Sequence, residues 1–123
     1  MVATVAADDT KAAESAGNAF LALVDAGKYD QAYKASAAIV TSKVTEKDFV
    51  AQVGDIRTQL GAVKNRHLSK VTPSDQIPGA PKDMKFIVLE FSTDFANKGG
   101  VTEIVSPMLE KDGKWRVAGY RFK

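Results

Sequence analysis

The sequence predicts an α+β domain in which three N-terminal helices pack on a curved four-stranded antiparallel sheet. The front half carries apolar residues at the spacing of amphipathic helices. The last third consists of three strand-like runs, residues 86–95, 101–110 and 114–122. A tight Asp112-Gly113 turn joins the last two runs. Helices that precede a meander of strands are typical of an α+β fold with one shared core.

The composition is that of one globular domain. The chain has 123 residues, of which 45% are hydrophobic and 26% are charged, so it can bury a core without a disulfide or a metal. We expect residues 8–123 to form a single α+β domain, and residues 1–7 to form a disordered N-terminal segment. The 17 basic and 15 acidic residues give a net charge of +2. This balance argues against a nucleic-acid partner, which requires a clustered basic face.

The sequence contains no cysteine and no long apolar run. The absence of cysteine excludes disulfides, cysteine-ligated zinc and thiol nucleophiles. No apolar run approaches the roughly 20 residues that span a bilayer, so we expect no membrane span. No spacing of ligand residues indicates a metal site, and no motif indicates a cofactor.

The first residues resemble the end of a removed signal peptide. Residues 2–7 are small and mostly apolar, and the acidic Asp8 and Asp9 follow them, as at a site that signal peptidase cleaves. This interpretation predicts a periplasmic or secreted protein. The alternative interpretation is an alanine-rich terminus that frays.

Two helices are expected in the first 40 residues. The first begins at Asp8 or Asp9, either of which can cap it, and ends at Gly27. The second runs from residue 28 to about residue 38 and carries Tyr33 on the face that Tyr29 begins.

A third helix opens at Thr45 and ends at Gly61. Its apolar face consists of Phe49, Val53, Ile56 and Leu60. At about 100° per residue, Arg57 points along this apolar face and not away from it. We therefore expect Arg57 to be mostly buried and paired with a carboxylate.

Four strands are expected after the helices, the first over residues 63–71. A loop that cannot continue a sheet ladder follows, and it contains Pro73, Pro78, Gly79 and Pro81. Residues 86–89 are apolar on both faces, with Phe86 and Val88 pointing opposite to Ile87 and Leu89. Pro107, in the run 101–110, indicates a sheet edge or a bulge.

Four segments carry a resemblance to a known bacterial family. They are residues 21–36 (LALVDAGKYDQAYKAS), 56–68 (IRTQLGAVKNRHL), 77–81 (IPGAP) and 103–122 (EIVSPMLEKDGKWRVAGYRF). Together they are similar to domain of unknown function 4019, although Tyr33 stands where that family usually has a tryptophan. The resemblance implies a nuclear-transport-factor-2-like or cystatin-like fold and an exported bacterial protein. It implies no established activity.

The candidate binding residues begin with two arginines, Arg57 and Arg66. A buried arginine requires an anion or a carboxylate, because an unpaired buried charge is costly. Glu103 alternates with inward-facing valines and is the expected partner of Arg57, ahead of Glu90. The first alternative is a structural bridge between the third helix and the sheet. The second is a pocket for an acidic ligand, which Tyr33 and Trp115 would help to line. The third is an arginine whose charged end extends along the apolar face to solvent.

No catalytic residue is assigned. His67 is the only histidine, and the sequence offers it no partner for acid–base or metal chemistry. The sequence therefore favours a non-enzymatic, exported domain that binds a small molecule or a protein. The alternatives are a small enzyme that uses a cavity between helices and sheet, and a structural domain that forms a homodimer through the convex face of the sheet.

Overall fold

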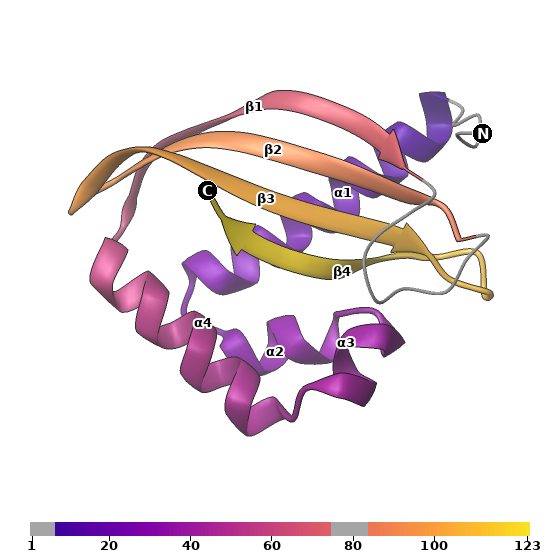
Figure 1. Ribbon diagram of the computed structural model, residues 1–123, viewed down its shortest axis with the longest axis horizontal. Helices are drawn as coiled ribbons and strands as arrows, with labels where there is room; N and C mark the ends of the chain where they lie inside the picture. The colour runs from indigo at the N-terminus through magenta and orange to yellow at the C-terminus, as the bar shows by residue number, and fades with distance from the viewer. Residues whose placement is uncertain (1–6, 75–83) are drawn as a thin grey trace.

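The structure is a computed structural model that describes residues 7–74 and 84–123 (Figure 1). Within these ranges four helices precede four strands: α1 (Ala7–Asp25), α2 (Tyr29–Lys34), α3 (Ala38–Lys43), α4 (Glu46–Leu60), β1 (Val63–Ser74), β2 (Phe86–Phe95), β3 (Lys98–Leu109) and β4 (Trp115–Phe122). The predicted α+β class, with helices before strands, is confirmed, and there is one more helix than expected. Most of the predicted segment 1–7, and the loop at Pro78, Gly79 and Pro81, lie outside the described residues.

The sheet is an antiparallel meander with the strand order β1-β2-β3-β4. Its register places Arg66 opposite Thr93 and Phe91 opposite Glu103. Because side chains on a strand alternate between the two faces, these strands bring Arg66, Thr93 and Glu103 to the same face. Polar groups far apart in the sequence therefore meet on one side of the sheet.

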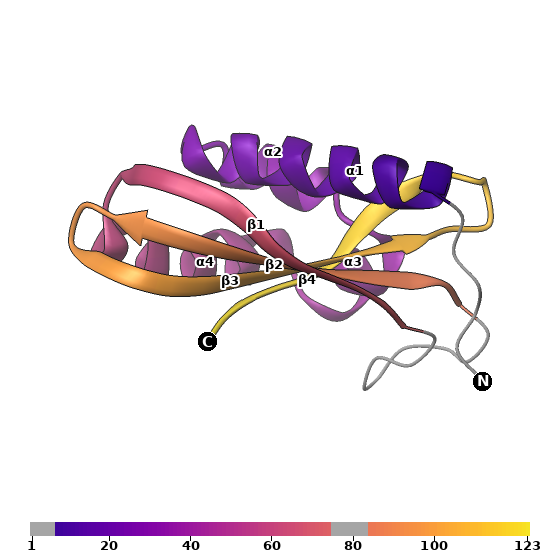
Figure 2. The same cartoon turned by 90° about the horizontal axis from the view of Figure 1, so that it is seen from above.

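Helix α1 covers that same face (Figure 2) and contacts β2, β3 and β4. Leu21 and Val24 of α1 are almost completely buried, as are Leu89 and Val105 of the sheet. The helix approaches closely because Gly17 has no side chain, since a Cβ there would lie 2.7 Å from Cδ1 of Leu89. The main core thus lies between α1 and the sheet, and α2 to α4 lie beyond the β4 edge (Figure 1).

The predicted continuous helix over residues 28–38 is wrong. The chain instead forms α2 and α3, separated at Ser36 and Ala37. Ser36 forms a parallel bridge with Val117, and the Ala37 N–H donates to the Val117 carbonyl at 2.8 Å. Ala37 is fully buried at this point, so its N–H needs a partner within the protein. Pairing with the edge strand β4 supplies that partner in place of a helical hydrogen bond.

A second, smaller core lies on the sheet face opposite α1. It consists of Ala37, Phe86 and Met108, with Ile39, Met84 and Ala118 packed against them. Phe86 and Ile87 therefore point to opposite faces, as predicted. Phe86 is covered by this cluster within the chain, so it offers no exposed surface to the homodimer that the sequence left as an alternative.

Helix α4 has the predicted ends. The Thr45 side chain accepts a hydrogen bond from the Asp48 N–H at 3.2 Å, and Gly61 ends the helix with a φ of 83°. Its predicted apolar face is wrong at Ile56, which is 41% exposed, whereas Arg57 is only 6% exposed. The buried side of α4 is thus rotated toward Arg57, whose burial is confirmed.

Prolines mark two further differences in the sheet. Pro73 was predicted to lie in a loop, yet it belongs to β1 and pairs with Ile87. The ladder tolerates it because β1 is an edge strand, the kind of strand to which proline within a sheet is largely confined. Pro107 lies at a register shift in which Ala118 and Gly119 of β4 both face Ser106. The predicted bulge is confirmed, and the extra residue belongs to β4.

Candidate functional site

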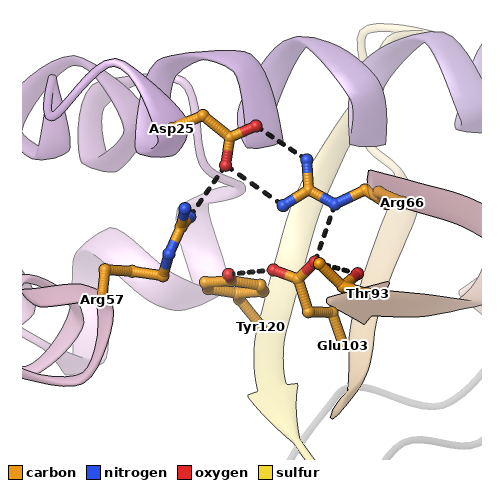
Figure 3. Close-up of polar contacts among 6 residues, drawn as sticks. All are labelled: Asp25, Arg57, Arg66, Thr93, Glu103 and Tyr120. Atoms are coloured by element: carbon orange, nitrogen blue, oxygen red, sulfur yellow. Dashed lines mark hydrogen bonds and ion pairs between the residues drawn. The ribbon is translucent and has the colours of Figure 1, made fainter. Parts of the chain in front are cut away.

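Six polar residues from six elements meet beside the main core (Figure 3). They are Asp25, Arg57, Arg66, Thr93, Glu103 and Tyr120, and we call them the polar cluster. The structure therefore brings together three of the predicted site residues, Arg57, Arg66 and Glu103. Asp25, at the C-terminal end of α1, lies between the two arginines in Figure 3.

Arg66 connects the end of α1 to the sheet. Its Nη1 lies 2.7 Å from Oδ2 of Asp25, and its Nη2 lies 3.1 Å from Oδ1. Its Nε donates to Oε1 of Glu103 at 2.7 Å. Such a two-pronged contact with one carboxylate and a third bond to another is the geometry in which arginine is held most firmly.

Glu103 is entirely excluded from solvent. Its Oε1 accepts from Arg66 and also from the Thr93 hydroxyl at 2.6 Å, and its Oε2 accepts from the Tyr120 hydroxyl at 2.5 Å. Burial, together with the charge of Glu103, raises the pKa of Tyr120 above its ordinary value. Tyr120 therefore stays protonated as the donor, and both oxygens of the carboxylate are occupied.

Arg57 contacts Asp25, not Glu103. Its Nη1 lies 2.9 Å from Oδ1 of Asp25, and its Cζ lies 5.0 Å from the centre of the Phe95 ring. Neither Nη1 nor Nε makes a well-aligned hydrogen bond within the described residues, so the contact with Asp25 is an ion pair held by charge. The predicted carboxylate pairing is confirmed, but the predicted partners Glu103 and Glu90 are wrong because Arg66 takes up Glu103.

The negative charge of Asp25 lies against both arginines. Partial burial alone would raise the pKa of its carboxyl group, but the hydrogen bonds and positive charge of Arg66, and then the contact with Arg57, outweigh burial and lower the pKa. Two arginines and two carboxylates thus neutralise each other. The polar cluster joins α1, α4 and all four strands. Its carboxylates are already engaged, so its geometry is that of a structural link between these elements.

A large open pocket lies elsewhere, on the face opposite α1. Its volume is about 780 Å³, and it lies between α3 and the hairpin that joins β3 to β4. Ile39, Met84 and Met108 form its apolar floor, which belongs to the smaller core. The rest of its lining is Ala38, Ser42, Lys43, Glu110, Lys111, Asp112 and Arg116. We call it the α3 pocket.

The rim of the α3 pocket is held by charged side chains of the hairpin. The Oε2 of Glu110 accepts from the Ala38 N–H at 2.9 Å, where α3 begins, and Oε1 accepts from Nη1 of Arg116 at 2.7 Å. The same Nη1 lies 3.0 Å from Oδ2 of Asp112. Gly113 has a φ of 83°, which fits the predicted tight turn. The turn thereby brings both acids to Arg116.

The remaining predicted site residues lie elsewhere. Tyr33 donates its hydroxyl to the Val44 carbonyl at 2.6 Å and packs against Phe49. Trp115 lines a separate small cavity of about 240 Å³ between α1 and β4, next to Phe20. His67 is exposed on β1. A role of the five predicted residues in ligand binding stays a prediction.

The lining of the α3 pocket was missed by the sequence analysis. Its apolar floor joins residues from three separate segments, and no local pattern connects them. One usable signal was the run from Glu110 to Arg116, in which one acid precedes the tight turn, a second acid forms part of it and an arginine follows. Such a pattern indicates a hairpin whose end is fixed by ion pairs.

Residues 7–74 and 84–123 hold no group of three or more histidine, aspartate or glutamate side chains placed to bind a metal ion. No helix in these ranges is long and apolar enough to cross a membrane.

Comparison with known proteins identifies the family. Neither a curated protein nor a solved structure matched the chain. The family described as "Protein of unknown function (DUF4019)" matches residues 16–120, a range that contains the whole polar cluster and the lining of the α3 pocket. The predicted family is confirmed, and the chain belongs to the DUF4019 family.

Proposed function

We propose that this chain is a binding domain without catalytic activity, and that the α3 pocket holds a small amphipathic molecule. The observation that carries the proposal is an apolar floor of Ile39, Met84 and Met108 beside a charged rim, in a volume of about 780 Å³. Sites for small molecules in proteins are typically concave, largely apolar and roughly 300–1,000 Å³ in volume, with few polar groups. The α3 pocket has these properties.

The chemistry of the pocket favours binding over catalysis. An acid–base catalyst needs a group that is free to exchange a proton with a substrate. In the α3 pocket, Glu110 and Asp112 are both engaged by Arg116. In the polar cluster, Glu103 is fully buried with both oxygens bonded.

Three finer expectations stay part of the proposal. A nuclear-transport-factor-2-like or cystatin-like fold fits a helix-covered curved sheet with a ligand cavity. A periplasmic or secreted location rests on the sequence interpretation of residues 2–9. A homodimer through the sheet rests on Val88, which is half-buried on the face opposite α1.

The test is saturable binding of the neutral dye Nile red, followed by fluorescence. Ile39→Glu places a charge in the apolar floor, and Ile56→Glu makes the same change at an isoleucine of α4 that is 41% exposed. We expect the first variant to lose dye binding and the second to keep it, with circular dichroism confirming that both are folded. Ser42→Trp should also weaken binding, because it fills the pocket without adding charge. Absence of saturable binding, or equal binding by all proteins, would contradict the proposal.

A further inference from the structure

The rim of the α3 pocket offers a ligand more hydrogen-bond donors than acceptors. This inference rests on the proposed function and specifies the ligand of the same site. We propose that the ligand carries an anionic head group, a carboxylate or a phosphate, which binds at Arg116 while its apolar part lies on Ile39, Met84 and Met108.

The acceptors on the rim are already used. One oxygen of Glu110 accepts from the Ala38 N–H and the other from Arg116. In Asp112, Oδ1 accepts from the Lys114 N–H at 3.1 Å and Oδ2 lies 3.0 Å from Nη1 of Arg116. Each carboxylate oxygen is therefore engaged by an N–H donor or by the charge of Arg116, and a cationic ligand would have to displace one of these contacts.

The donors on the rim are in surplus. Both carboxylate contacts of Arg116 run to the same nitrogen, Nη1, which leaves Nε and Nη2 outside these two contacts. Guanidinium groups bind carboxylate and phosphate through two parallel N–H donors. The Arg116 side chain is 31% exposed and lines the pocket. It can therefore keep its hold on the hairpin and still bind a ligand oxyanion.

The apolar floor strengthens the attraction of an anion to Arg116. An anion gains more from the charge of Arg116 where the neighbouring apolar floor excludes water. The flexible side chains of Met84 and Met108 can adapt to an alkyl chain beside it. An amphipathic anion thus satisfies both parts of the lining.

The test is calorimetric titration of the whole chain with four ligands that share an alkyl chain. They are decanoate, decyl phosphate, decanol and decyltrimethylammonium, each below its micelle concentration. We expect either anion to bind at least about tenfold more tightly than decanol, and the tighter anion to identify the head group. The preference should weaken with added salt, because exposed charges are screened.

Variants at two arginines of β4 provide the matched control. Arg116→Gln should remove the preference for the anion while decanol binding stays, and Arg121→Gln, at an exposed position outside the pocket lining, should keep the preference. Equal binding of decanoate and decanol, tighter binding of the ammonium, or an unchanged preference in Arg116→Gln would overturn the inference. Failure of all four ligands would overturn the proposed function as well.

Discussion

Nε of Arg66 lies 2.7 Å from Oε1 of Glu103, a carboxylate with no solvent exposure. This bond joins β1 to β3 across β2, and Thr93 of β2 donates to the same oxygen. A fully buried carboxylate is tolerated only when donors satisfy it. The polar cluster therefore fixes the edge strand β1 and the end of α1 relative to the central strands.

Glu103→Gln should destabilise the fold by about 2–4 kcal/mol, because Arg66 loses the opposite charge in a buried site. Chemical denaturation with urea measures the change. The matched control is Glu90→Gln, which is half-buried on the opposite face of the sheet and should cost less than about 0.5 kcal/mol. Equal losses in the two variants would show that Glu103 has no special structural role.

Arg57→Met should cost less than about 1 kcal/mol, whereas Arg57→Ala should cost about 2–4 kcal/mol. The reason is that Asp25 keeps its two-pronged contact with Arg66, and methionine still fills the space beside Phe95. Urea denaturation of the two variants measures the difference. A methionine variant as unstable as the alanine variant would mean that the charge of Arg57, and not its volume, supports the fold.

The stability of the fold should depend on the charge of Asp25. Because the pKa of Asp25 is lowered in the folded protein, its contribution is fully present above the ordinary aspartate value of 3.8 and is lost as the pH falls through the lowered pKa. Asp25→Asn should therefore be less stable than the natural chain at neutral pH, and the gap should shrink in strong acid. A gap that does not change with pH would contradict the assigned ion pairs.

Gly17→Val should destabilise the fold by about 1–3 kcal/mol, because the added side chain collides with Leu89 in a packed core. Thermal denaturation measures this loss. Asn18→Val makes the same kind of change on the exposed side of α1 and should cost much less. If both variants lose the same stability, the close approach of α1 to Leu89 is not the cause of the loss.

Local sequence signals correctly predicted the features that depend only on neighbouring residues, namely the ends of α4 and the tight turn. Thr45 and Gly61 cap and end α4 through their own backbone and side chain, and Gly113 supplies the turn geometry. The break at Ser36 and Ala37 was not predictable, because it depends on pairing with a strand at the other end of the chain.

In the polar cluster and in the α3 pocket too, contacts between distant segments could not be predicted. The burial of Arg57 followed from its angular position on a helix, but its partner Asp25 depends on how the end of α1 meets α4. The α3 pocket was missed because its floor joins Ile39, Met84 and Met108, which are close only after the sheet forms.

The central claim is that the α3 pocket is the binding site, and amide NMR spectra recorded during a titration with decanoate test it most directly. We predict saturable shifts at Ile39, Met108 and Arg116, which line the pocket. Residues of the polar cluster, such as Arg57 and Thr93, should not shift. Shifts confined to the polar cluster, or no saturable shift at any residue, would contradict the claim.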